Sequence, residues 1–443
     1  MWRLSLRTVR ARLTSYVATA SVIVAGTALL TAFAALAETG VADQSGGSET
    51  LAILAAIMGG WTMVVVVFGV VSTVSLSVQQ RERELALLRA IGTTPAQVRR
   101  SVLVETVAVA LPAVAVGVLP GIWLGSFLLA RIADVGVAVA DTGLVTTWRA
   151  LAFGVLTSLL SAVMAATVAG RRASLVAPVL ALAAPGDLPD RSSVITRPRL
   201  HVGIAFVVLG FGAGIGTLFT ANGPMLSAAA GPACIATAIG LALLSPAVVA
   251  AASRAAGVVP SGVARLAMRN LGARAARATT VVGPLTLLVG IAVGTLYMQT
   301  TEDSRVAASP GSPQFAAANY LVVAMIIAFC AIAVTNTLLA ATWHRRRELG
   351  LLRLIASTRR QVLGMMAVES LISAAVAVVL GSVAALTTTV PYSIVRTGSA
   401  IPAGPPWMYP AIAGGAAVVT LAATLLPTLR ATRVRPVAAL GVA

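Results

Sequence analysis

The sequence predicts an all-α polytopic membrane protein with about ten transmembrane helices. Two observations carry this prediction. Of the 443 residues, 58% are hydrophobic and only 10% are charged, whereas soluble domains carry about 25% charged residues. Runs of about 20 apolar residues, each long enough to cross a hydrocarbon core of ~30 Å as a helix, recur along the whole chain. One such run can form the core of a soluble protein, but a chain made almost entirely of them cannot be soluble.

The apolar runs are separated by short connectors, none long enough to fold as a separate domain. We expect the spanning helices at residues 15–37, 51–77, 102–130, 149–169, 201–219, 227–253, 279–298, 319–343, 362–388 and 408–429.

The arginine distribution predicts the orientation of the chain. The net charge is +18 and every one of the 32 basic residues is Arg. A nucleic-acid partner would need a concentrated, soluble basic face, whereas these arginines lie in short connectors. Alternate connectors hold all but Arg131, Arg149, Arg305 and Arg396. By the positive-inside rule, we expect a multi-pass protein of the cell membrane with both termini in the cytoplasm. Exclusive use of Arg, with much Ala, Val and Gly, favours a GC-rich bacterial source.

The first apolar run has an alternative interpretation as a cleaved secretory signal, because a basic lead precedes it and AALA precedes Glu38. The run is longer than a usual signal core, and a similar lead occurs in mid-chain, where no signal peptide can stand. RLSLRTVRAR at residues 3–12 matches RLAMRNLGAR at residues 265–274. We therefore favour a retained helix.

Two further matches occur in the same order. RERELALLRAIGTTPAQV at residues 81–98 matches WHRRRELGLLRLIASTRRQV at residues 343–362, and GRRASLVAPVLAL at residues 170–182 matches LRATRVRPVAAL at residues 429–440. Three ordered matches at nearly one offset predict two parallel four-helix repeats plus an inserted two-helix hairpin. Repeats that start on the same side are related by an axis along the membrane normal.

This repeat divides the chain into three parts. We expect a first four-helix unit at residues 1–185, a linker with helices five and six at residues 186–258, and a second four-helix unit at residues 259–443. The glycines at positions 210, 212, 214 and 216, in helix five, have the spacing of close helix packing.

Each charged stretch predicts a short cytoplasmic amphipathic helix, because leucines and an isoleucine recur at a spacing of three among charged residues. The candidate site residues are Arg83, Glu84, Leu85, Leu88, Arg89, Ile91 and Gly92 in the first stretch, and Arg347, Glu348, Leu349, Leu352, Arg353 and Ile355 in the second. Gly92 predicts the end of the first short helix, and Ala356 at the matching position predicts a weaker stop in the second stretch. TPAQ at 94–97 and TRRQ at 358–361 then predict capping boxes that start the return helices.

Such a helix can lie on anionic lipid, form a solvated loop or dock into a partner. Docking is the alternative that explains the shared order of apolar and charged residues, since apolar knobs fill a groove while flanking charges fix the register.

Glu105 and Glu369 are also in register, about two turns into the return helices. An acid exposed to lipid is costly. The pair therefore marks either a possible intramembrane proton or substrate site or, as we favour, carboxylates near the inner face that bond Arg99, Arg100 or a neighbouring helix.

At these stretches the sequence resembles the FtsX-like permease family, the MacB-type membrane subunits of ABC transporters. The family's R-E-x-x-L-L-R-x-I-G pattern corresponds to Arg83–Gly92 and, with Ala356 for the final glycine, to Arg347–Ala356. The resemblance implies that each stretch is a coupling helix held by a cytoplasmic ABC ATPase subunit, with two ATPase copies for the two stretches. The outer loops are short, so we expect a compact ten-helix form without the large extracytoplasmic domain of many members.

ATP hydrolysis is expected in a separate polypeptide. A phosphate-binding loop needs Gly-x-x-x-x-Gly-Lys-Ser/Thr, and the sequence contains no Lys. No carboxylate pair, nucleophile triad or His/Cys cluster predicts an enzyme, a cofactor or a metal site.

Three functions remain open. The first is an ABC transporter permease that exports or extracts a hydrophobic or amphipathic substrate. The alternative is an ATPase-driven signalling or regulatory subunit that moves no substrate. An ion-coupled carrier ranks third. Such carriers place ionisable residues near the membrane midplane, whereas Glu105 and Glu369 are expected near the inner face. Peptide, lipid, lipoprotein and drug substrates all fit an apolar helix bundle.

Overall fold

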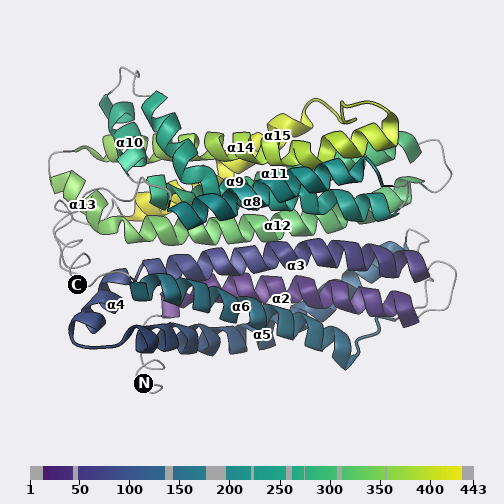
Figure 1. The fold of residues 1–443 in the computed structure, drawn as a ribbon, viewed down its shortest axis with the longest axis horizontal. Helices are drawn as coiled ribbons and strands as arrows, with labels where there is room; N and C mark the ends of the chain where they lie inside the picture. Colours follow the sequence, from purple (N-terminus) through teal and green to yellow (C-terminus); the bar gives the residue numbers. More distant parts are fainter. Residues whose placement is uncertain are drawn as a thin grey trace.

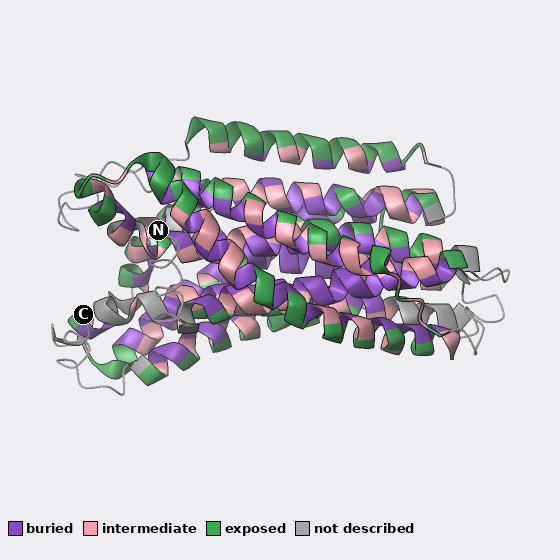
Figure 2. Ribbon diagram, turned by 90° about the horizontal axis from the view of Figure 1, so that it is seen from below, coloured by how far each residue is buried: buried purple, intermediate pink, exposed green. Residues whose placement is uncertain are grey.

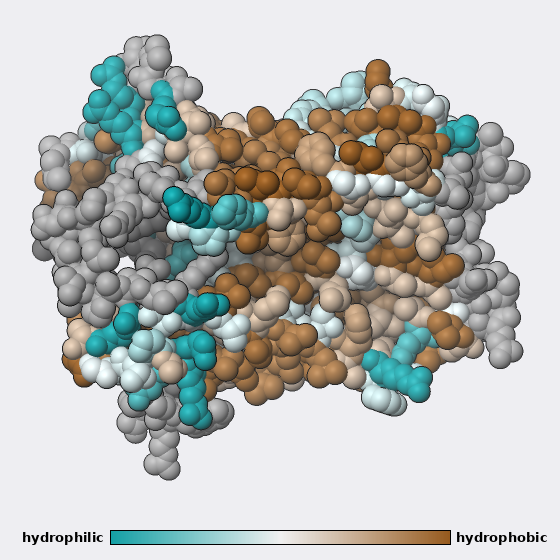
Figure 3. Space-filling view, in the orientation of Figure 1, coloured by the Kyte–Doolittle hydropathy of each residue, from teal (hydrophilic) through white to brown (hydrophobic). Residues whose placement is uncertain are grey.

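The protein is a helical bundle built from long membrane-spanning helices. The computed structural model describes residues 13–42, 48–134, 143–175, 196–220, 224–255, 262–273, 275–306, 312–354 and 357–431. Within this part of the chain, ten helices are long and apolar enough to cross a bilayer, which confirms the predicted fold class. Apolar side chains form a broad band across the middle of the visible face, with hydrophilic side chains toward the two ends (Figure 3).

In the described part of the first half there are four long helices and one short helix. The long helices are α2 (Leu13–Ala42), α3 (Ser48–Gln79), α5 (Pro95–Ala133) and α6 (Trp148–Leu175), and the short helix α4 (Glu82–Ala90) joins α3 to α5. They make up the lower part of the bundle in Figure 1. Helix α2 packs extensively against α3, α5 and α6.

The second half repeats this order of elements. Its long helices are α11 (Ala275–Val306), α12 (Ser312–His344), α14 (Arg359–Thr397) and α15 (Met408–Ala431), and the short helix α13 (Arg346–Leu354) joins α12 to α14. A further short helix, α10 (Gly262–Ala273), precedes α11 and packs against α14. The basic lead that corresponds to α10 in the first half lies outside the described residues.

A hairpin stands between the two halves in sequence but packs mainly on the second. It consists of α8 (Arg197–Thr217) and α9 (Pro224–Ala255), and α9 contacts α11 and α14 extensively. Close packing is confirmed for two of the four predicted glycines. A Cβ at Gly210 would lie 2.1 Å from Thr237 Oγ1, and one at Gly214 2.4 Å from the Thr387 carbonyl. The prediction of close packing is wrong for Gly212 and Gly216, which face open space.

The two halves meet where α12 lies against α2 and α3 (Figure 1). The amide of Asn336 on α12 donates a hydrogen bond of 2.8 Å to Ser21 Oγ on α2. The Phe329 ring packs beside Gly26 and Gly69, where a Cβ would lie 3.6 and 3.3 Å from the ring. Buried residues concentrate in the middle of the bundle (Figure 2), so the core is shared by both halves.

Several helices extend beyond their predicted apolar limits. Helix α11 continues past residue 298 to Val306, and α14 continues past residue 388 to Thr397. The added turns carry charges that bond to one another: Arg396 Nε donates to Glu302 Oε2 at 2.6 Å, and the Tyr392 hydroxyl donates to the same oxygen at 2.8 Å. An apolar pattern ends at the first charged residues, whereas the helix continues where those charges are paired. The predicted unit boundaries after residues 185 and 258 lie outside the described residues.

Candidate functional site

The candidate site lies where the two short helices connect long ones. Helices α4 and α13 are nine residues each and lie at the same end of the bundle (Figure 1). Each follows the second long helix of its half and precedes the third. The sequence predicts this order, because an apolar run gives way to a charged stretch and then to a capping box.

Helix α4 turns part of its apolar surface outward. Leu85 is buried at 4% exposure, whereas Leu87, Leu88 and Ile91 are 52, 43 and 79% exposed. The predicted stripe of Leu85, Leu88 and Ile91 is therefore covered at Leu85 and exposed at the other two residues. Leu85 and its neighbour Ala86 face the bundle, and this anchorage leaves the next apolar side chains facing outward.

Helix α13 has the same anchor but a more covered outer face. Leu349 is 1% exposed, and it belongs to a small apolar cluster with Ala267 of α10 and Met365 of α14. Leu352, the counterpart of Leu88, is half-buried against this cluster. Leu351 and Leu354 are exposed at 45 and 47%. The two short helices therefore present different apolar surfaces.

The structure describes only part of the predicted site. The side chains of Arg83, Arg347, Glu348 and Arg353, and the whole of Ile355, lie outside the described part of the chain. Glu84 is described: Arg81 Nε donates to its Oε2 at 3.5 Å. Arg89 is half-buried in the last turn of α4.

The turns after the short helices have the predicted chemistry. Gly92 has φ +103°, a left-handed conformation that glycine adopts without steric cost, so its role as a helix stop is confirmed. Both capping boxes are also confirmed. Thr94 and Gln97 exchange backbone-to-side-chain bonds of 2.8 and 3.3 Å, and Thr358 and Gln361 do so at the same distances. These caps fix the start of each return helix beside its short helix.

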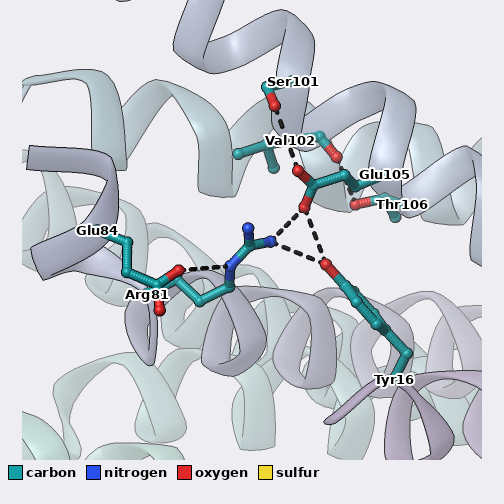
Figure 4. Close-up of polar contacts among 7 residues, drawn as sticks. All are labelled: Tyr16, Arg81, Glu84, Ser101, Val102, Glu105 and Thr106. Atoms are coloured by element: carbon teal, nitrogen blue, oxygen red, sulfur yellow. Dashed lines mark hydrogen bonds and ion pairs between the residues drawn. The ribbon is translucent and has the colours of Figure 1, made fainter. Parts of the chain in front are cut away.

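A buried polar network ties the α3–α4 junction to α5 and α2 (Figure 4). Arg81 Nη1 donates to Glu105 Oε2 on α5 and, at 2.8 Å, to the hydroxyl of Tyr16 on α2. The Tyr16 hydroxyl donates in turn to Glu105 Oε2 at 2.9 Å, and Ser101 Oγ donates to Oε1 at 3.3 Å. The Arg81 and Glu105 side chains are 17 and 8% exposed, so this ion pair is largely removed from solvent.

The second half contains a matching ion pair. Arg345, in the turn between α12 and α13, donates through Nη1 and Nη2 to the two carboxylate oxygens of Glu369 on α14, at 2.5 and 3.4 Å. This two-point contact is the strong geometry for guanidinium and carboxylate. The Glu369 carboxylate thus accepts its hydrogen bonds from Arg345, whereas the Glu105 carboxylate accepts hydrogen bonds from two hydroxyl groups as well as from an arginine.

These contacts support the interpretation of Glu105 and Glu369 as paired carboxylates. Their partners are Arg81 and Arg345, rather than Arg99 or Arg100 as one alternative expected. Sequence reasoning missed both arginines, although they are in register 264 residues apart, like the two glutamates. Tyr16 had no local signal, because it lies 65 residues before Arg81.

The electrostatics of the network keep the arginine charged. Burial lowers the pKa of Arg81, but the hydrogen bond and negative charge of Glu105 outweigh it, and the pKa lies above its ordinary value. The described residues hold no cluster of three His, Cys, Asp or Glu that could bind a metal. The network thus forms a joint, an ion pair with hydrogen bonds that connects the α3–α4 junction to α5 and α2.

Comparison with known proteins identifies a family. The model of the FtsX-like permease C-terminal family matches residues 56–177 and 320–436, together more than half of the chain. The two matched segments cover most of α3–α6 and α12–α15, including both short helices. A search of the curated proteins finds no match.

Proposed function

The chain belongs to the FtsX-like permease family, and from this premise we propose that it couples ATP hydrolysis in a separate ATPase subunit to the export or extraction of a hydrophobic or amphipathic substrate. The family consists of membrane subunits of ABC-type transporters. The observation that carries the proposal is that two short helices, each after the second long helix of its half, present exposed apolar side chains at one end of the bundle.

The exposed side chains of α4 suit a groove on a partner. Leu87, Leu88 and Ile91 extend from a helix anchored by Leu85, and a large part of each of these side chains is exposed. A short amphipathic helix commonly binds by laying such residues into an apolar groove. Leu351 and Leu354 offer the same contact on α13.

The ion pairs provide the path from such a contact into the membrane. A displacement of α4 by the ATPase acts on Arg81, the residue just before the helix, and through Arg81 on Glu105 of α5 and Tyr16 of α2. In the second half, Arg345 connects α13 to Glu369 of α14. Because a buried ion pair is costly to separate, each short helix and its return helix move together.

Two short helices support a complex with two ATPase subunits, one at each. The sequence holds no Lys and hence no phosphate-binding loop of its own. The arginine-rich connectors support a cytoplasmic location for α4 and α13, in the cell membrane of a bacterium, with both termini on that side.

Duplication of a four-helix unit explains why the two halves correspond. Arg81 and Arg345, and Glu105 and Glu369, make the same ion pair 264 residues apart. One family model matches a segment of each half. The hairpin of α8 and α9 is then an insertion between the two copies.

The coupling role is tested by placing a charge on the proposed contact. Tagged protein is purified in mild detergent from its own cells, and the ATPase activity that accompanies it is measured. We expect Ile91→Glu to reduce this activity at least tenfold, because a carboxylate would have to enter an apolar groove. Ile401→Glu is the matched control: the same residue, 80% exposed against 79%, at the opposite end of the bundle.

Two results would contradict the coupling role. One is the absence of any accompanying ATPase with the unchanged protein. The other is an equal loss in both variants. To separate transport from signalling, the recovered complex is reconstituted in vesicles. ATP-dependent movement of an amphipathic dye between leaflets supports transport, whereas ATP hydrolysis that changes only the activity of an associated kinase or hydrolase supports a regulatory subunit.

A further inference from the structure

A cavity of about 650 Å³ lies among α11, α12 and α15 of the second half. It occupies the half of the bundle away from α4 and α13, because its lining extends from Leu288, midway along α11, to Thr300 near the far end of that helix. Its volume falls in the range of about 300–1,000 Å³ typical of ligand pockets. Trp407 and Ala411, which contribute to the lining, are exposed, so the cavity opens on the outer surface of the bundle.

The lining is apolar except at one end. Side chains such as Leu288, Ile327 and Val419 form the deep part. Thr300 and Tyr320 stand at the far end, where Thr300 Oγ1 donates to the Ala403 carbonyl at 2.6 Å and the Tyr320 hydroxyl donates to Asp303 at 2.8 Å. The cavity thus has the polarity of one amphiphile, with an apolar length and a single polar end.

Trp407 indicates the depth of the polar end in the bilayer. Its side chain is 67% exposed and precedes the first residue of α15. Exposed tryptophans at the ends of spanning helices lie at the level of lipid head groups. The cavity therefore extends from head-group level into the hydrocarbon layer, on the side opposite the coupling helices.

The fourth long helix is packed differently in the first half. A Cβ at Gly154 of α6 would lie 2.3 Å from Thr31 Oγ1 and 3.0 Å from the Thr31 backbone nitrogen of α2. On α15, Gly414 and Gly415 have no atom within 4 Å of such a Cβ, and Gly415 lines the cavity. The shared order of helices therefore does not by itself produce the open space beside α15.

The length and lining of the cavity suit a single hydrocarbon chain. Leu288 to Thr300 covers about 18 Å at 1.5 Å per helical residue, and the side chains along this length are apolar. An extended acyl chain can lie along that length and contact the apolar side chains at about 3.5–4.0 Å.

We propose that this cavity is a binding site for one acyl chain of a membrane phospholipid, whose head group lies beside Trp407 and Tyr320. The described lining comes from α11, α12, α15 and the residues just before α15, so we expect its occupation to require no ATPase.

The test uses the full chain in phosphatidylethanolamine–phosphatidylglycerol vesicles that contain a trace of phospholipid with a photoreactive diazirine on one acyl chain. After irradiation, labelled peptides are mapped by mass spectrometry. We expect at least fivefold more label on α12 and α15 than on α3 and α6. Gly415→Trp should remove most of that difference by filling the cavity. Gly414→Trp is the matched control, because the neighbouring glycine is equally open but does not line the cavity.

A second variant, Ala331→Trp, fills the cavity from α12 and should give the same loss if the α15 variant fails to fold. Equal labelling of the two halves would overturn the proposal, because it indicates ordinary contact with bulk lipid. Unchanged labelling in both cavity-filling variants would overturn it, as would exclusion of the lipid by a copurifying membrane protein. Each of these results leaves the coupling experiment unaffected.

Discussion

The two halves of the protein share a joint but differ in what surrounds it. In the first half, Glu105 accepts hydrogen bonds from Arg81, Tyr16 and Ser101, and α4 turns Leu88 outward. In the second half, both oxygens of Glu369 are bonded by Arg345, and α13 packs into an apolar cluster with α10 and α14. The ion pair is common to both halves, whereas the support of the carboxylate and the exposure of the short helix are not.

The fourth long helices differ more widely. Helix α6 packs closely against α2 and α3, whereas α15 makes fewer contacts with α11 and α12 and leaves a cavity there. The first and third long helices, by contrast, are equally close in both halves. A Cβ would lie 2.8 Å from the Val24 carbonyl at Gly117 of α5, and 2.9 Å from the Thr286 carbonyl at Gly381 of α14. The comparison teaches that the joint and the central helix pair are the constant parts, and that the periphery is where the halves diverge.

The largest expected effect tests the two ion pairs. Removal of one partner of a buried pair costs about 3–5 kcal/mol, so Arg345→Met should strongly lower the free energy of unfolding. Arg81→Met should lower the free energy of unfolding by a smaller amount, about 1.5–3 kcal/mol, which is the contribution of a hydrogen bond to a charged group. The loss is smaller because Glu105 keeps its hydrogen bonds from the hydroxyls of Tyr16 and Ser101. Chemical denaturation in detergent micelles measures both.

The double variant Tyr16→Phe with Arg81→Met tests the reason given for the smaller loss. If the Tyr16 hydroxyl supports Glu105, the combined variant should lose about as much stability as Arg345→Met. An Arg81→Met variant that is already less stable than Arg345→Met would contradict this account of the two halves.

An intermediate effect is expected where the fourth helices differ. Gly154→Ala places a methyl group against the Thr31 backbone, and overpacking of this kind costs about 1–3 kcal/mol. Gly414→Ala enters open space and should leave the unfolding midpoint unchanged or slightly higher, since Ala favours helix. Thermal unfolding of the two purified variants measures this; equal midpoints would show that α6 and α15 are packed alike.

The smallest effect is expected where the halves agree. Thr94→Ala and Thr358→Ala each remove the side-chain acceptor of a capping box, at a cost of about 0.5–2 kcal/mol. Because the two boxes have the same bond lengths, the two losses should match. Hydrogen exchange of the first-turn amides of α5 and α14 detects these losses. Exchange that increases in only one half would mean that the two capping boxes contribute unequally to the stability of their helices.

Sequence patterns found the parts of the site that depend on local chemistry. The short helices, the stop at Gly92 and both capping boxes depend on residues within a few positions of one another. The positions of Glu105 and Glu369 were visible for the same reason. Their partners were not, because Arg81 and Arg345 reach across a turn to a different helix, and Tyr16 comes from a helix 89 residues before Glu105.

Apolar composition and spacing by themselves determined that this protein is a bundle of about ten membrane-spanning helices with two similar charged connections. This follows because a bilayer requires about 20 apolar residues per helix and full internal bonding of the backbone. Only the tertiary structure decided that Leu88 is exposed while Leu352 is half-buried, and that a cavity lies beside α15 whereas Gly154 of α6 packs against Thr31. Those differences depend on which helices pack beside each half, and no local pattern of residues specifies a distant neighbour.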